Sequence, residues 1–165
     1  MTGQVLRLPG DITLAWCTLD GISGHEAGRQ LLRQLCGGTL PEIAVTDRGK
    51  PYFPQGELHF SISHTKGHAF CAVSPRNIGI DAEEMDRPIR PELAEKILSP
   101  SELARFREAE DPRDALLRLW VLKEADAKRS GEGLRGYPNR TDFSPDDSRI
   151  FTLDRCYVAV LTEGE

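Results

Sequence analysis

The apolar segments of this 165-residue chain are short, and the order of strands and helices along the sequence restricts the fold most. Strand-like segments and one helical segment come first, a helical stretch follows, and strand-like segments return at the end. Regular alternation of strand, helix and strand, which a doubly wound parallel sheet requires, is absent. The sequence therefore predicts an α+β fold in which helices pack on largely antiparallel sheets.

Strands are expected where a short apolar run lies between turn residues. The run at 12–19 is bounded by Gly10 and Gly21, and residues 58–63 alternate apolar and polar side chains, as a half-buried strand does. Further strands are expected at 43–46, 70–73 and 78–81, and a closing hairpin is expected at 149–153 and 156–161.

Helices are expected from the spacing of apolar residues and from the signals at their ends. The segment 25–36 has apolar residues at helical spacing and is followed by two glycines. A short helix is expected at 91–98, and Ser99-Pro100 is typical of the start of the next one. Asp111-Pro112 gives the same signal for a long helix that reaches about Arg129.

Composition and charge argue against several classes of protein. The chain has 21 Lys and Arg against 26 Asp and Glu, a net charge of -5, so a nucleic-acid partner is not expected. No apolar run approaches the roughly 20 residues that span a bilayer, and the first residues make a poor signal peptide. The four cysteines form no CxxC pair and are expected to be free thiols. We therefore expect a cytoplasmic protein with no membrane partner.

Two carboxylates in the segment 78–83, at the end of the expected strand, form the first candidate site. Strand alternation places Asp81 and Glu83 on the same face, where burial would strengthen their repulsion. A divalent cation would relieve that repulsion, and hard oxygen ligands suit Mg²⁺. Taken alone, a DxE sequence at a strand end is more often surface charge.

The long helix contributes the second candidate. Trp120, Glu124 and Lys128 lie four residues apart and share one helix face, which would present a third carboxylate and a cation on a rigid element. In isolation, the alternative of an ordinary ion pair on the helix surface is favoured.

The third candidate is the end of the strand at 58–63. Ser63 and His64 are neighbours and point to opposite faces of a regular strand, which disfavours a Ser–His nucleophilic dyad. A hydroxyl and a ring N–H fit phosphate binding better. A lone histidine is more often structural, so this indication is weak by itself.

Together, and in this order, these segments resemble the 4′-phosphopantetheinyl transferases of the type that activates surfactin synthetase. The resemblance covers residues 49–134, about half of the chain. It rests on Gly49-Lys50-Pro51, Phe60-Ser61-Ile62-Ser63-His64, Gly79-Ile80-Asp81-Ala82-Glu83 and the run from Trp120 to Lys128.

The resemblance implies a pseudo-dimer of two similar halves, residues 1–76 and 77–165, each with a small, mostly antiparallel sheet and a long helix. It implies Mg²⁺-dependent transfer of 4′-phosphopantetheine from coenzyme A to a serine of an apo carrier protein, with release of 3′,5′-ADP. The carrier would be an acyl, peptidyl or aryl carrier domain, and the transferase is expected to act as a monomer.

The resemblance also implies roles for individual residues. Asp81, Glu83 and Glu124 match the metal ligands. Glu124 is the candidate base, acting directly or through a metal-bound water, and Lys128 matches the lysine that assists the leaving group. The positions expected to hold coenzyme A are Lys50, Pro51, Ser63, His64 and Lys128. Lys123 has no assigned role, and Glu102 is given a supporting one.

Two alternatives to this function remain open. The chain could be a degenerate family member that binds a carrier protein or a synthetase without transferring anything. It could also be an unrelated Mg²⁺-dependent phosphoesterase, which would need no protein acceptor.

Overall fold

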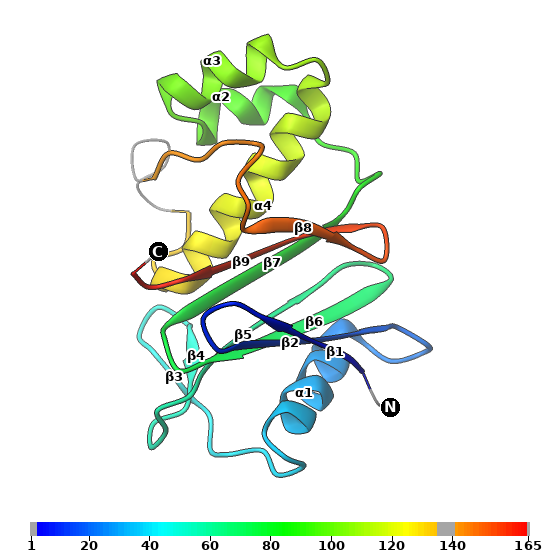
Figure 1. The fold of residues 1–165 in the computed structure, drawn as a ribbon, viewed down its shortest axis with the longest axis vertical. Helices are drawn as coiled ribbons and strands as arrows, with labels where there is room; N and C mark the ends of the chain where they lie inside the picture. Colours follow the sequence, from blue (N-terminus) through cyan, green and yellow to red (C-terminus); the bar gives the residue numbers. More distant parts are fainter. Residues whose placement is uncertain (1–2, 135–140, 165) are drawn as a thin grey trace.

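The computed structural model describes residues 3–134 and 141–164, which form two antiparallel sheets with helices packed against them (Figure 1). The four-stranded sheet has the order β1-β2-β6-β5, and the three-stranded sheet has the order β7-β9-β8. The strands β3 and β4 form a separate two-stranded hairpin. The predicted α+β class with antiparallel sheets is confirmed, while the similarity of two halves stays a prediction.

The four-stranded sheet is built from the first half of the chain. Its strands are β1 (Gln4–Leu8), β2 (Ile12–Thr18), β5 (His59–His64) and β6 (His68–Ser74). Helix α1 (Gly24–Leu35) begins after Ser23, whose side chain accepts from the Glu26 amide, and packs on one face of the sheet. The small hairpin consists of β3 (Ala44–Val45) and β4 (Pro51–Tyr52).

Strand β1 was absent from the expected elements. It pairs with β2 along its whole length, from Gln4 opposite Trp16 to Leu8 opposite Ile12. Because β1 is the edge of the sheet, most of its side chains are exposed, and it has no continuous apolar run to indicate a strand.

The three-stranded sheet comes from the second half of the chain. It consists of β7 (Ile78–Glu84), β8 (Ile150–Leu153) and β9 (Cys156–Thr162), as the hairpin prediction required. A 3-10 turn (Pro91–Leu93), α2 (Ala94–Ile97) and α3 (Pro100–Glu108) lie between β7 and the long helix. Helix α4 (Pro112–Ser130) is capped by Asp111 and ends at Gly131, whose φ is 72°.

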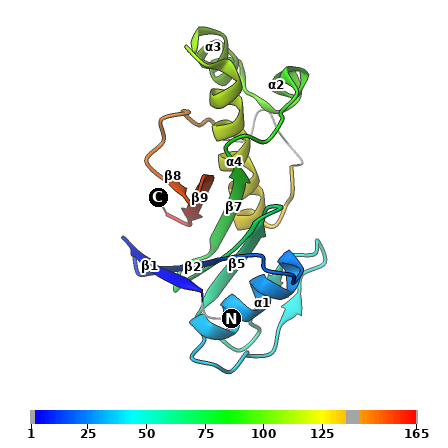
Figure 2. The same cartoon turned by 90° about the vertical axis from the view of Figure 1, so that its right-hand side faces the viewer.

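The inner faces of the two sheets meet in a shared apolar core. It contains Ile12 and Leu14 of β2, Phe70 of β6, and Ile78 and Ile80 of β7. The alternate residues of β7 face away from this core, toward α4, which runs along the strand (Figure 2). The alternation predicted for this strand therefore places Asp81 and Glu83 on the α4 side.

A glycine sets the distance between β7 and α4. A Cβ atom at Gly79 would lie 2.0 Å from the Ala125 carbonyl oxygen and 2.4 Å from the Arg129 amide nitrogen. Strand and helix are thus in direct backbone contact, and no side chain fits between them.

Two further expectations concern the cysteines and the membrane. All four cysteines are free, as predicted. No helix in the described parts of the chain is long and apolar enough to cross a membrane.

Candidate functional site

Three carboxylates lie near one another where β7 passes α4. Strand β7 supplies Asp81 and Glu83, and α4 supplies Glu124. Burial raises the pKa of both Glu83 and Glu124, and the charge of Asp81 raises each of them further. The charge of Asp81 acts on both glutamates, so the three predicted metal ligands share one electrostatic environment. Within residues 3–134 and 141–164, however, no three such side chains are already close enough to enclose a metal ion.

Asp81 is the most buried member of this group, with 5% of its surface exposed. Its Oδ1 accepts hydrogen bonds from Ser63 Oγ at 3.0 Å and from Lys128 Nζ at 2.7 Å. Its Oδ2 is buried and has no hydrogen-bond partner among the described residues. A buried carboxylate oxygen without a partner is costly, and a cation would satisfy it. The donor set, all carboxylate oxygens, fits a hard divalent ion such as Mg²⁺.

Two side-chain cations partly balance the three carboxylates. Lys128 bridges Asp81 and Ser63, with its Nζ 3.2 Å from Ser63 Oγ. Arg87, which follows β7, forms an ion pair with Glu83 and lies over the ring of Trp120, 5.8 Å from its centroid. The predicted helix face of Trp120, Glu124 and Lys128 is therefore turned toward the carboxylates.

The hydroxyls of β5 hold the edge of β7. Ser61 Oγ accepts from the Ile80 amide at 3.0 Å, and Ser63 Oγ accepts from the Ala82 amide at 3.2 Å. Side chains thus bridge the two sheets at a place where no backbone ladder joins them. Sequence reasoning missed this role, since both serines could equally have faced a ligand.

Ser63 and His64 point to opposite sides of β5, as expected from strand alternation. Ser63 is buried against Asp81, and His64 is exposed and packs against Gly24 at the start of α1. A Cβ atom at Gly24 would lie 2.5 Å from Cγ of that imidazole.

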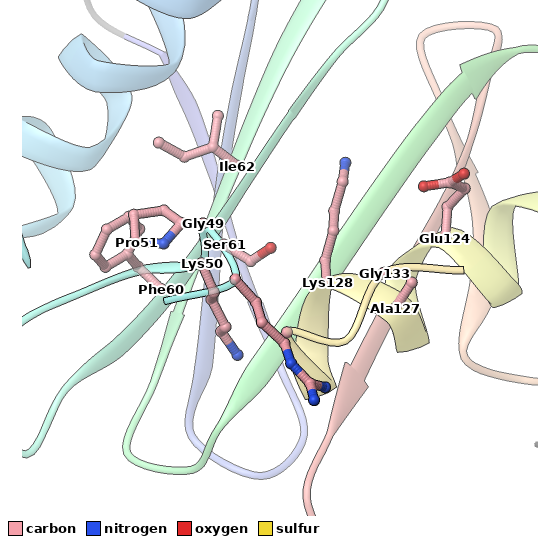
Figure 3. A pocket seen from close by; sticks show the side chains of 12 residues that line it. Gly49, Lys50, Pro51, Phe60, Ser61, Ile62, Glu124, Ala127, Lys128 and Gly133 are labelled. Carbon is pink, nitrogen blue, oxygen red and sulfur yellow. The ribbon is translucent and has the colours of Figure 1, made fainter. Parts of the chain in front are cut away.

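A cavity of about 290 Å³ adjoins the carboxylates (Figure 3). Its lining includes Lys50, Pro51 and Phe60 on one side and Glu124 and Lys128 on the other, so residues predicted to bind coenzyme A and to catalyse meet here. In Figure 3 the side chains of Glu124 and Lys128 extend from the same side of α4. The predicted binding residues Ser63 and His64 are not part of this lining, and His64 instead lines a second cavity beside Glu83.

Lys50 joins the two halves of the chain at this cavity. Its Nζ donates to Asn77 Oδ1 at 2.5 Å and to the Arg129 carbonyl near the end of α4. Burial, followed by the nearby charge of Arg129, lowers the pKa of Lys50 to about 8. Its ammonium group therefore contacts the helix end and lines the cavity at the same time.

Lys123, to which no role was assigned, forms a buried ion pair. Its side chain and that of Glu102 are both 0% exposed, with Nζ and Oε2 2.8 Å apart. Glu102 also accepts from the amides of Ser99 at 2.8 Å and Phe143 at 2.7 Å. A signal was present in the sequence: Lys123 lies between Leu119 and Ala127 at four-residue spacing, on a buried helix face.

Comparisons with known proteins identify one family. The sequence profile described as "4′-phosphopantetheinyl transferase superfamily" matches residues 77–160. That range contains all three candidate metal ligands and Lys128.

Several curated proteins are similar to this chain. A 4′-phosphopantetheinyl transferase of Bacillus subtilis is 37% identical over 95 residues, covering 56% of this chain and 42% of the relative. The 4′-phosphopantetheinyl transferase HetI of a Nostoc species is 36% identical, covering 66% and 52%. A putative 4′-phosphopantetheinyl transferase of Haemophilus influenzae is 32% identical, covering 71% and 51%. The chain spans about half the length of these relatives.

Proposed function

Because this chain belongs to the 4′-phosphopantetheinyl transferase superfamily, we propose that it transfers 4′-phosphopantetheine from coenzyme A to a serine of an apo carrier protein. The other product would be 3′,5′-ADP. The observation that carries the proposal is Oδ2 of Asp81, which has no hydrogen-bond partner in residues 3–134 and 141–164 and is buried beside two glutamates with raised pKa. Such an arrangement fits a bound cation better than a closed structural network.

In this proposal Asp81, Glu83 and Glu124 hold Mg²⁺. When bound, the ion supplies positive charge to the phosphate groups of coenzyme A. The chain's own contribution is to keep the three carboxylates together, through the backbone contact at Gly79 and the hydroxyl of Ser63. The residues present therefore suit the ion that the family implies.

Glu124 is proposed as the base for the carrier serine. Burial and the nearby Asp81 raise its pKa, so the Glu124 carboxylate binds a proton more readily than an exposed glutamate does. As the serine oxygen forms a bond to the attacked phosphorus, its proton would pass to Glu124. General base catalysis of this kind contributes roughly 10²- to 10⁴-fold to a rate.

Lys128 is proposed to assist the leaving group. The phosphorus–oxygen bond to 3′,5′-ADP breaks, and the ammonium group neutralises the negative charge left on the departing phosphate. Lys128 lines the cavity and is held 2.7 Å from Asp81, which fixes the position of its charge.

The 290 Å³ cavity is proposed to receive part of coenzyme A. Lys50 and Pro51 form its far wall, and Lys50 is charged below its pKa of about 8, as an anionic ligand requires. Ser63 and His64 are proposed to make further contacts with coenzyme A. Since both halves of one chain, 1–76 and 77–165, line the cavity, a cytoplasmic monomer would suffice.

The test is incubation with coenzyme A, Mg²⁺ and a panel of apo carrier proteins, followed by intact-mass measurement. The expected result is one phosphopantetheine adduct on at least one carrier, dependent on Mg²⁺. No adduct on any carrier, with folded protein, would contradict the proposal. A carrier that is bound but not modified would instead support the non-catalytic alternative, and hydrolysis of coenzyme A without a carrier would support the phosphoesterase alternative.

A further inference from the structure

The two cations at the carboxylate cluster are held in different ways. Lys128 projects from the middle of the site and contacts both Asp81 and Ser63. Arg87 sits at the mouth, in the turn that follows β7, where its amide donates to the Glu84 carbonyl at 2.9 Å. The side chain of Arg87 is 40% exposed, while that of its partner Glu83 is 21% exposed. The side chain of Lys128 is 34% exposed, so solvent and ions can reach both cations.

The backbone of this turn is fixed independently of the Arg87 side chain. The guanidinium of Arg113, in the first turn of α4, donates to the carbonyls of Met85 at 2.9 Å and Arg87 at 2.7 Å. The Arg87 guanidinium can therefore leave Glu83 while its own backbone stays in place.

There is space for the guanidinium to move into. A polar cavity of about 630 Å³ is lined by His64, Lys66, Glu83 and Arg87, among others, next to the carboxylate cluster. Rotation of the Arg87 side chain into this cavity would keep its charge solvated. The cost of leaving Glu83 is then the loss of one partly exposed ion pair and of the contact with Trp120.

We propose that Arg87 is a built-in competitor of the divalent cation: its guanidinium is paired with Oε1 of Glu83 and opposes binding of the ion to that carboxylate. The proposal rests on the assignment of Glu83 as a metal ligand made above. The guanidinium takes up part of the acceptor capacity of Oε1, so the ion would share the Glu83 carboxylate with a second cation, and the two cations repel each other. Arginine keeps its charge at all physiological pH values, so this competition is constant.

The test is calorimetric titration of the full chain with Mn²⁺, without coenzyme A or a carrier. Arg87→Gln should bind Mn²⁺ roughly three- to tenfold more tightly than the unmodified chain, because a competing ion pair and a like charge are both removed. Arg90→Gln, which removes an exposed arginine from the same connecting segment, is the matched control and should change affinity by less than about twofold.

Further variants separate competition from a change in structure. Arg87→Lys keeps the charge and should return most of the affinity to that of the unmodified chain. Arg87→Ala should behave as Arg87→Gln does, and thermal melting establishes that each variant is folded.

The proposal is overturned if removing the Arg87 charge weakens Mn²⁺ binding or leaves it unchanged. It is also overturned if Arg87→Lys behaves as the uncharged variants do, or if the unmodified chain binds no Mn²⁺. The titration contains no transfer substrate, so a failure to modify carriers would leave its outcome unaffected.

Discussion

Lys123 and Glu124 are neighbours on α4, yet their charges lie in opposite kinds of surroundings. Lys123 is fully buried and paired with Glu102, whose two oxygens also accept backbone amides. Glu124 faces Asp81 and Glu83, and the raised pKa values of both glutamates record burial and repulsion. One helix thus presents a neutralised ion pair on one face and an incompletely neutralised acidic cluster on another.

The buried pair of Lys123 and Glu102 stabilises the fold, whereas the charges around Glu124 are suited to binding a ligand. A buried ion pair whose hydrogen bonds are complete specifies how segments meet, and here it joins α3, α4 and residues 141–143. A buried oxygen such as Oδ2 of Asp81, which no group in the described part of the chain hydrogen-bonds, lowers the stability of the unliganded protein. Removing a charge from each region should therefore have different consequences.

The largest effect is expected from Glu102→Gln. This change leaves the Lys123 ammonium buried without its counter-charge, which should lower the free energy of unfolding by about 3–5 kcal/mol. Urea denaturation measures it. Glu95→Gln removes one partner of the exposed Arg107 ion pair and serves as the control, with an expected loss below about 1 kcal/mol. If the two variants lowered the free energy of unfolding equally, the buried pair of Lys123 and Glu102 would be no more important for stability than an exposed ion pair.

Glu124→Gln should separate stability from activity. The change removes the proposed base and a metal ligand, so transfer to the best carrier should fall by roughly 10²- to 10⁴-fold. The free energy of unfolding should stay the same or rise, since one repelling charge is lost. Initial rates by mass spectrometry and a melting curve test the two statements. Unchanged transfer would show that the catalytic and metal roles are wrongly assigned.

A smaller effect is expected from Lys128→Ala. The proposed leaving-group role predicts that turnover falls more than coenzyme A affinity does, because the ammonium acts mainly on charge that develops during transfer. Steady-state kinetics and calorimetry with coenzyme A give the two quantities. Loss of affinity alone would contradict that role and would make Lys128 purely a binding residue.

The smallest and most gradual effect is the response to pH. The folded-state pKa values of Glu83 and Glu124 lie above the value of about 4.3 expected in an unfolded chain. As pH falls through the raised pKa values, Glu83 and Glu124 are protonated in the folded protein before they are protonated in the unfolded chain. Their repulsion then no longer destabilises the folded protein. Mn²⁺ affinity should weaken over the same interval, because protons and metal compete for the same oxygens.

The carboxylate of Asp142 provides the internal contrast for this pH response. Burial raises its pKa, but hydrogen bonds from Ser101 and Ser99 and the Arg105 guanidinium outweigh that effect and lower the pKa to about 2. Its contribution to stability is present above the unfolded-state pKa and is lost only as pH falls toward 2. Calorimetric titrations at several pH values test the expected change in Mn²⁺ affinity, and melting curves at the same pH values test the expected change in stability. Stability that rises steadily from acid to neutral pH would contradict the raised pKa values assigned to Glu83 and Glu124.

Local periodicity predicted the parts of the site that lie within one element. Alternation placed Asp81 and Glu83 on one face of β7, and four-residue spacing placed Glu124 and Lys128 on one face of α4. That β7 and α4 meet followed from the family resemblance, since no periodicity within either element relates the two. The pairing of Arg87 with Glu83 depends on the path of a turn, which local pattern does not specify.

The burial of Lys123 shows a second limit. A lysine is ordinarily a surface residue, and only its partner on α3, far away in the sequence, makes a buried position tolerable. Strand β1 was missed for a related reason, because pairing at a sheet edge requires a neighbour but no apolar run.

The contact at Gly79 limits how the metal preference of this protein could be redesigned. The strand and the helix that carry the three carboxylates touch through their main chains there, so the separation of the two main chains is already at its minimum. A smaller ion could be accommodated only by longer or reoriented acidic side chains. A larger ion could be accommodated by shortening one of them, from glutamate to aspartate, while the scaffold beneath stays unchanged.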